Sequence, residues 1–344
     1  MNAPTVSVVM SVYNGERFLQ QAILSIHQQT WTDFEFILID DASTDASPAI
    51  IHDWAKRDSR ILPVTNDHNL GLTRSLNKGI RLARGRWIAR MDADDFSLPE
   101  RLDKQVGFLI NNPQVGLLGS AAWIMNAEGI VEDTFHRNPT THTEICWRVI
   151  LANPFFHSSV MLDRQLALVN PYDESIPYGQ DFELWGRFLE VTQGANLAEP
   201  LVQLGRHPNR VSILHTRDQF RLGLNIMKKR LASHLQNIQW NEEIIHEMRQ
   251  ITQSDWPTPH ETSRAWERVL KLFTAFASQN RPDQKTIHQI RQQLIRHLLL
   301  SLSFPQGPRP TWPLLKQMII GFPGATLEEL FHYFQTRLAS QRPV

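Results

Sequence analysis

The sequence predicts an α/β protein in which a mainly parallel sheet flanked by helices is followed by an α-helical C-terminal appendage. Three observations lead to this prediction. In the first hundred residues, short apolar runs alternate four times with helical stretches, which is the pattern of parallel strands joined by helical crossovers. From about residue 116 to residue 212 the pattern becomes mixed. Beyond His215 the chain is mostly helical, with breaks at prolines.

Local patterns justify the elements of the first half in order. Residues 6–12 form an apolar, β-branched run that ends at the turn residues Tyr13-Asn14-Gly15, so we expect a buried strand followed by a turn. Ser43-Thr44-Asp45 is typical of an N-cap region and opens the second helix. The expected strands are 6–12, 35–39, 61–64 and 86–91, and the expected helices between them are 16–29, 48–56 and 73–83.

The second half continues with weaker patterns. We expect strands at residues 116–120 and 157–162 and a helix at residues 181–190, which complete the same domain. The expected C-terminal helices are at about 217–236, 241–253, 260–279, 284–303 and 325–340.

Composition excludes several classes of protein. With 344 residues, 42% of them apolar and 20% charged, the chain has the composition of a soluble globular protein. Its 35 basic and 35 acidic residues give a formal net charge of zero, so we expect no nucleic-acid partner. The single Cys146 excludes an internal disulfide and a cysteine-based zinc site. The N-terminus lacks a signal-peptide pattern, which predicts a cytoplasmic location and leaves peripheral contact with the inner face of the cell membrane open.

Three carboxylates, Asp92, Asp94 and Asp95, directly follow the strand expected at residues 86–91. Carboxylates spaced one residue apart beyond a strand can converge on Mg²⁺ or Mn²⁺, and these ions commonly share their ligands with substrate phosphates. A nucleotide diphosphate is therefore the leading ligand. The alternative is a solvated acidic turn that caps the next helix. Ligands of parallel sheets bind at the carboxyl ends of the strands, where Tyr13, Asp41 and Asn69 also fall.

Four segments, residues 6–15, 38–45, 69–71 and 91–95, resemble in this order the family 2 glycosyltransferases with a GT-A fold. The likeness extends to about residue 215, so we expect a catalytic domain over residues 1–215. Residues 216–344 would then form a helical region for acceptor, membrane-surface or homo-oligomer contacts. The resemblance implies a Rossmann-like nucleotide-diphospho-sugar transferase fold and a sugar nucleotide donor, with a UDP-sugar as the leading candidate. It also implies a divalent metal, Mn²⁺ or Mg²⁺, and inversion at the anomeric carbon.

The resemblance also implies roles for individual residues. Asp41 would hydrogen-bond the nucleotide base, and the segment around Tyr13 would form a wall of the base pocket. Asp92 and Asp94 would hold the ribose and the metal with its diphosphate, and His207 would be a further metal ligand. Arg206 or Arg210 would contact phosphate. The expected donor-binding residues are Val12, Tyr13, Glu16, Asp41, Asn69, Arg74, Asp92, Ala93 and Asp94.

The segment from Tyr178 to Trp185 resembles the family's acidic motif before a helix, in which the residue matching Asp181 is the catalytic base. A sugar hydroxyl is a poor nucleophile near neutral pH, so a carboxylate must accept its proton as the new bond forms. This sequence has Gln180 where Glu is commoner. A neutral neighbour removes like-charge repulsion, which predicts a lowered rather than a raised pKa for Asp181. The structural alternative is that Asp181 is an N-cap of the helix.

Other residues also have structural alternatives. Asp41 could only cap the helix that follows it. His157 is expected to be a hydrogen-bonded histidine at a strand start. At least two of Trp123, Trp147 and Trp185 are expected to pack in the core rather than against a sugar. Glu183 would either orient the base or lie on a solvated helix face.

The resulting prediction is a metal-dependent inverting glycosyltransferase. It would move a sugar from its nucleotide diphosphate to a hydroxyl of a glycan or lipid-linked acceptor in cell-surface polysaccharide biosynthesis. Two alternatives stay open. One is a sugar-phosphate nucleotidyltransferase, which needs a Gly-rich basic loop after the first strand that residues 13–17 do not convincingly supply. The other is a non-catalytic scaffold protein that binds sugar nucleotides.

Overall fold

The computed structural model describes residues 3–126, 129–206, 216–234, 245 and 259–302. The chain divides into two compact units, one formed by Met1–Ile145 and Asn153–Leu222, the other by Cys146–Ala152 and Gly223–Val344. The predicted domain boundary at residue 215 lies outside the described residues and stays a prediction.

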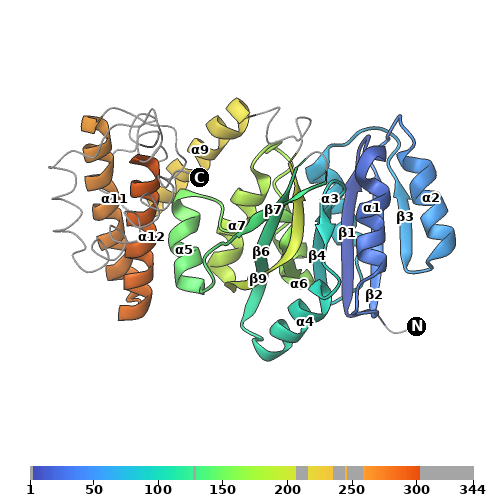
Figure 1. Cartoon of the computed structure of the whole chain (residues 1–344), viewed down its shortest axis with the longest axis horizontal. Helices are drawn as coiled ribbons and strands as arrows, with labels where there is room; N and C mark the ends of the chain where they lie inside the picture. Colours follow the sequence, from blue (N-terminus) through green and yellow to red (C-terminus); the bar gives the residue numbers. More distant parts are fainter. Residues whose placement is uncertain (1–2, 127–128, 207–215, 235–244, 246–258, 303–344) are drawn as a thin grey trace, which may run out of the picture. The chain divides into compact units, whose positions relative to one another are not determined.

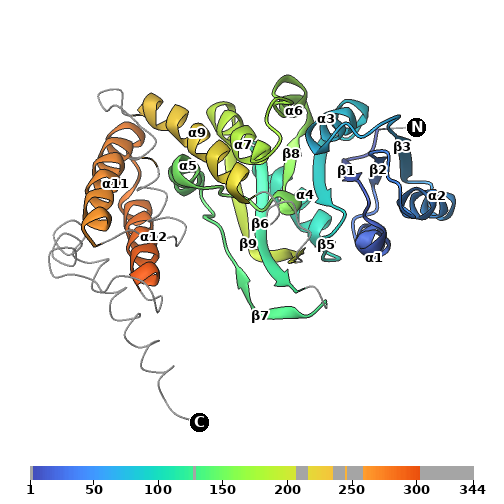
Figure 2. The same ribbon diagram turned by 90° about the horizontal axis from the view of Figure 1, so that it is seen from above.

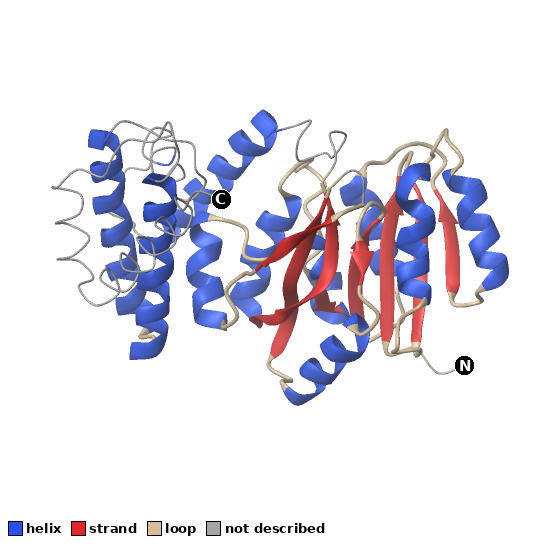
Figure 3. Cartoon of the chain, in the orientation of Figure 1, coloured by secondary structure: helices blue, strands red, loops and turns tan. Residues whose placement is uncertain are grey.

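Strands of the first unit form one sheet, nine-stranded within the described residues, with the order β3-β2-β1-β4-β8-β6-β9-β5 and β7 beside β6 (Figure 1 and Figure 3). The strands are β1 Val6–Val12, β2 Phe34–Asp40, β3 Ile61–Thr65, β4 Trp87–Asp92, β5 Phe96–Ser97, β6 Val115–Met125, β7 Val131–His136, β8 Met161–Asp163 and β9 Gln193–Gly205. Strands β1 to β4 pair in parallel, whereas β8 runs antiparallel to both β4 and β6. The predicted parallel half and mixed half of the sheet are therefore confirmed.

Helices cover both faces of this sheet, as Figure 2 shows for α1 and α2 on one side and α3 and α6 on the other. The described helices of this unit are α1 Glu16–His27, α2 Ser47–Arg57, α3 Leu72–Leu82, α4 Arg101–Asn111, α6 Arg164–Val169 and α7 Gln180–Val191, with α5 His142–Leu151 and α9 Thr216–His234 each shared between the two units. Successive side chains of β1 point to opposite faces of the sheet and pack against the helices there. Val8 and Met10 belong to the core that includes α1, α2 and α4, whereas Val9 lies against α3.

Two local predictions are wrong. Residues 157–162 do not form one strand, because His157–Ser159 makes a 3₁₀ turn before β8 begins at Met161. The helix expected at residues 48–56 is present as α2, but its N-cap is Ala46, and no side chain caps it. Asp45, which precedes this N-cap, accepts hydrogen bonds from the amides of both Ser47 and Glu16. The helices predicted at 241–253 and 325–340 lie outside the described residues, apart from residue 245.

The second unit contains the C-terminal part of α9, together with α11 Pro259–Asn280 and α12 Gln284–Leu302. Trp147, at 3% exposure, packs against Phe273 and Phe276 of α11, with ring centroids 5.4 and 5.3 Å away. Arg230 donates a hydrogen bond to the carbonyl of Val149 at 2.6 Å. None of the helices in the described part of the chain combines the length and the apolar character needed to cross a membrane.

Candidate active site

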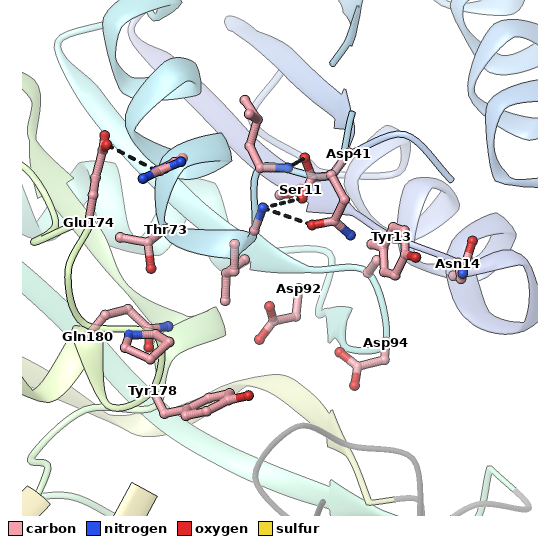
Figure 4. Close-up of a pocket in the computed structure, with 18 of the residues that line it drawn as sticks. Ser11, Tyr13, Asn14, Asp41, Thr73, Asp92, Asp94, Glu174, Tyr178 and Gln180 are labelled. Carbon is pink, nitrogen blue, oxygen red and sulfur yellow. Dashed lines mark hydrogen bonds and ion pairs between the residues drawn. The ribbon is translucent and has the colours of Figure 1, made fainter. Parts of the chain in front are cut away.

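A pocket of about 690 Å³ opens at the carboxyl ends of β1, β2 and β4 (Figure 4). All the predicted donor-binding residues line it except Val12 and Glu16. The lining residues among them are Tyr13, Asp41, Asn69, Arg74, Asp92, Ala93 and Asp94. Sequence analysis did not assign the other polar side chains in the lining, which include Arg17, Glu174, Tyr178 and Gln180. The structure thus brings together the strand-end motifs of the first hundred residues and a loop from much later in the chain.

Val12 and Glu16 do not line the pocket, but both form hydrogen bonds with the turn after β2. Val12 is 1% exposed, and its carbonyl accepts a hydrogen bond from the Asp41 amide at 2.8 Å. The Glu16 carboxylate accepts from the Ala46 amide, and the Glu16 amide donates to Asp45, both at 2.9 Å. These bonds join the turn after β1 to the turn after β2, and the other oxygen of Asp45 accepts from the Ser47 amide at 2.9 Å. Direct donor contacts of Val12 and Glu16 stay predictions.

Asp41 is a buried carboxylate, 1% exposed, and does not cap α2. It accepts hydrogen bonds from Asn66 Nδ2 at 2.7 Å, from the Leu70 amide at 2.8 Å and from the Gly71 amide at 2.9 Å. Gly71 is the N-cap of α3 and has a φ of 84°, a conformation that glycine adopts without strain. Asp41 therefore ties the Asn69-Leu70-Gly71 turn to β2. Its contact with a nucleotide base stays a prediction.

The acidic cluster after β4 is a candidate metal site. Carboxylate oxygens of Asp92, Asp94 and Asp95 lie within 4.8 Å of one another. Such hard oxygen donors fit Mg²⁺ or Mn²⁺. Asp95 is fully buried, where it accepts hydrogen bonds from the Ser158 hydroxyl and from the Gly205 amide, the latter at 2.9 Å. Asp95 is therefore not part of a solvated turn, and its hydrogen bonds hold this end of the cluster in place. His207 lies outside the described residues.

Sequence analysis missed Arg90, which precedes this cluster on β4. It is 2% exposed, forms an ion pair with Asp92 and donates to the Ser158 hydroxyl at 2.9 Å. Burial alone would lower the pKa of Arg90, but the adjacent Asp92 carboxylate raises it above its ordinary value. Arg90 thus remains a buried cation that balances the acidic cluster. The sequence contained a signal for this pair, because Arg90 and Asp92 are two residues apart on a strand and therefore lie on the same face.

Asp181 lies in the first turn of α7 and is not its N-cap, which is Gly179 in a left-handed conformation with a φ of 72°. The half-buried Asp181 carboxylate accepts a hydrogen bond from Asn153 Nδ2 at 2.6 Å. Burial raises the pKa of Asp181, so the predicted lowering is wrong. Desolvation of the carboxylate outweighs the hydrogen bonds from the Phe182 amide and Asn153 and the charge of Arg90, which all lower the pKa. Tyr178 and Gln180 line the pocket, whereas Asp181 is not among the lining residues.

The loop before α7 is fixed to α3. Asn77, 2% exposed, donates to the Tyr172 carbonyl at 2.9 Å and accepts from the Tyr172 amide at 3.0 Å. Arg74 lies 3.5 Å from Glu174 in an ion pair between the same two elements (Figure 4). Helix α3, whose first turn faces the pocket, therefore also holds the loop that leads to Asp181.

Several structural alternatives are also decided. His157 forms a hydrogen bond with the Tyr172 hydroxyl at 2.8 Å, so the expected hydrogen-bonded histidine is confirmed. Trp147 and Trp185, at 3% and 0% exposure, pack in the core as expected. Glu183 pairs with Arg187 one turn later, at 2.8 Å, which favours the helix-face interpretation for this residue.

Comparisons with known proteins agree with this geometry. The model of the family "Glycosyl transferase family 2" matches residues 7–162. An uncharacterized glycosyltransferase of Haemophilus influenzae is 30% identical over 256 residues, which cover 71% of this chain and 79% of that protein. An amylovoran biosynthesis glycosyltransferase of Erwinia amylovora is 32% identical, over 58% of this chain and 75% of that protein. A UDP-Glc:α-D-GlcNAc-diphosphoundecaprenol β-1,3-glucosyltransferase of Escherichia coli is 28% identical, over 52% of this chain and 68% of that protein.

Two solved structures share the fold at low sequence identity. Residues 1–349 of Staphylococcus aureus TarS in complex with UDP give a TM-score of 0.52 at 13% identity, over 99% of this chain and 93% of that one. A mannosyltransferase of Pyrobaculum calidifontis in complex with GDP-Man and Mn²⁺ gives a TM-score of 0.52 at 15% identity, over 96% of this chain and 88% of that one.

Proposed function

The chain belongs to glycosyl transferase family 2 and has its GT-A fold, and from this premise we propose that it is a metal-dependent, inverting enzyme of cell-surface polysaccharide assembly. It takes a sugar from a nucleotide diphosphate donor, with a UDP-sugar as the first candidate, and transfers it to a hydroxyl of a glycan or lipid-linked acceptor. The observation that carries the proposal is that Asp41, Asp92 and Asp94 line the same pocket at the carboxyl edge of the sheet. The relatives from Erwinia amylovora and Escherichia coli support the acceptor class by their names.

The pocket offers distinct surroundings for the parts of the donor. We place the nucleotide base between Tyr13 and Asp41, because an exposed aromatic ring and a carboxylate suit a flat, hydrogen-bonding group. The ribose and diphosphate would lie toward Asp92 and Asp94. Arg74, which lines the same pocket, would contact phosphate oxygens.

Asp94 and Asp92 would hold a Mn²⁺ or Mg²⁺ ion, which when bound supplies positive charge against the charge that develops on the leaving diphosphate. Arg90 fixes Asp92 from the other side through its ion pair. Solved structures with the same fold contain UDP, or GDP-Man with Mn²⁺, which supports a nucleotide donor and a divalent ion as the ligands of this pocket.

Asp181 acts as the general base in this proposal. Its carboxylate accepts the proton of the acceptor hydroxyl while the acceptor oxygen bonds to the anomeric carbon. The bond from that carbon to the donor phosphate oxygen breaks, and its electron pair leaves with the nucleoside diphosphate. One such displacement inverts the anomeric centre. Because burial raises the pKa of Asp181, the ionised carboxylate is a stronger base than an exposed aspartate.

Calorimetric binding of UDP, GDP, dTDP and CDP, first with Mn²⁺ and then with EDTA, tests the proposed donor site. We expect one nucleotide to bind in preference to the others and its affinity to fall when EDTA removes the metal. The preferred nucleotide names the donor base. If none of the four binds in the presence of Mn²⁺, the donor assignment is wrong and the scaffold alternative gains support.

A further inference from the structure

Asn153, which does not line the pocket, contacts the proposed base. Asn153 follows α5 and donates its amide hydrogen to Asp181 Oδ2 at 2.6 Å. We propose that Asn153 is a positioning residue, whose amide fixes the direction in which the Asp181 carboxylate meets the acceptor hydroxyl. This inference rests on the proposed function, since it assumes that Asp181 is the base. It adds a residue that neither the pocket lining nor the sequence motifs identified.

The geometry fixes both ends of the Asn153 side chain. Its Oδ1 accepts a hydrogen bond from the Phe155 amide at 3.1 Å, which defines which end of the amide carries the hydrogens. Nδ2 is thereby turned toward Asp181 Oδ2. A carboxylate held at one oxygen cannot rotate freely about its Cβ–Cγ bond, so the direction of Oδ1 is set as well. Donation to an ionised carboxylate also stabilises the form of Asp181 that accepts a proton.

Several charged or titratable groups surround Asp181. Substitution of Asn153 tests its hydrogen bond directly, because the state of each other group is set by its own contacts. Arg90 on β4 interacts favourably with the ionised carboxylate, and it is a buried guanidinium that remains charged. Tyr172, in the loop before α7, is a buried phenol whose pKa burial raises, so it stays neutral. Its hydroxyl is bonded to His157, and Glu183 on α7 itself is paired with Arg187. Because His157 is a histidine bonded to Tyr172 beside this carboxylate, its variant belongs among the controls.

The test uses the full chain with Mn²⁺ and the sugar nucleotide whose nucleotide binds in the calorimetric panel. Release of nucleoside diphosphate is measured against pH with water as acceptor, and donor affinity is measured separately. We expect Asn153→Ala to lower kcat at least about tenfold with donor affinity unchanged, as the loss of a hydrogen bond to a charged group predicts. The acidic limb of the pH profile should move up by about one pH unit, because the ionised form of Asp181 loses a donor.

Asn153→Asp is the second variant, and it keeps the size of the side chain. It places another carboxylate beside Asp181, so the two groups share a proton and the acidic limb should move further upward. Asn111→Ala on α4, an exposed asparagine bonded within its own helix, is the matched control and should change neither quantity. His157→Gln separates any shift that comes from the histidine.

Wild-type kcat and an unchanged acidic limb in both Asn153 variants would overturn the inference. So would a loss of kcat that is matched by an equal loss of donor affinity. Asp181→Asn, measured in the same assay, separates this failure from failure of the proposed function. If Asp181→Asn is inactive while both Asn153 variants behave as wild type, only the positioning role is wrong. If Asp181→Asn is fully active, the base assignment itself is wrong.

Discussion

The donor side of the pocket and the side that carries Asp181 are built in different ways. On the donor side, Tyr13, Asp41 and Asp92 lie at the end of a strand or directly after it. The bond between Asp41 and the Leu70 amide spans 29 residues. On the Asp181 side, the loop before α7 is held by α3, which lies much further away along the chain. Tyr172 in that loop lies 95 residues from Asn77 of α3, although the bond between Asn153 and Asp181 itself spans 28 residues. The two sides therefore differ in how far local sequence determines them.

The largest expected effect separates the two sides by function. Asp181→Asn should lower the rate of nucleoside diphosphate release by about 10²–10⁴-fold, because the amide cannot accept the acceptor proton. Donor affinity should stay within a few fold, since Asp181 does not line the pocket. In the wild type, activity should fall as the pH drops through the pKa of Asp181, which lies above the ordinary aspartate value. Rate measurements across pH, paired with calorimetry of the donor nucleotide, check these outcomes. An equal loss of rate and affinity would contradict the separation.

Asp94→Ala should produce the opposite result, with its main effect on the donor side. Removal of one metal carboxylate should weaken Mn²⁺-dependent nucleotide binding by at least about tenfold and leave binding in EDTA unchanged. The measurement is calorimetry of the nucleotide in both conditions. Asp103→Ala, an exposed acid in the first turn of α4, is the control for loss of a negative charge. If the affinity of Asp94→Ala with Mn²⁺ equals that of the wild type, Asp94 is not a metal ligand.

The same contrast explains what could be predicted from the sequence. The strands β1, β2 and β4 and the pocket residues at their ends were predictable, because apolar periodicity fixes where a parallel strand stops and the chemistry follows within a few residues. The roles of Arg90 and Asn153 were not predicted. Asn153 has no local pattern, since its partner Asp181 is 28 residues away and on another element. The direction of the Asp181 pKa shift was also missed, because burial is a property of the folded chain and a neighbour in sequence does not reveal it.

The smallest effect concerns the link between the two sides. Asn77 bonds both backbone groups of Tyr172, so Asn77→Ala leaves two buried partners without their hydrogen bonds and should lower the free energy of unfolding by about 2 kcal/mol. The Arg74–Glu174 ion pair joins the same elements, but its side chains are 57% and 43% exposed. Arg74→Ala should therefore change stability by less than about 1 kcal/mol. Urea unfolding of both variants measures the two values.

Activity then shows what the Asn77 link does for the site. If the loop before α7 depends on α3 for its position, Asn77→Ala should lower kcat several-fold with donor affinity unchanged, because the loop leads to Asp181 while the donor turn is held separately by Asp41. A parallel fall in donor affinity would mean that the two sides form one cooperative unit. The difference between local and long-range assembly would then describe only how the site is encoded in the sequence, and not how it works.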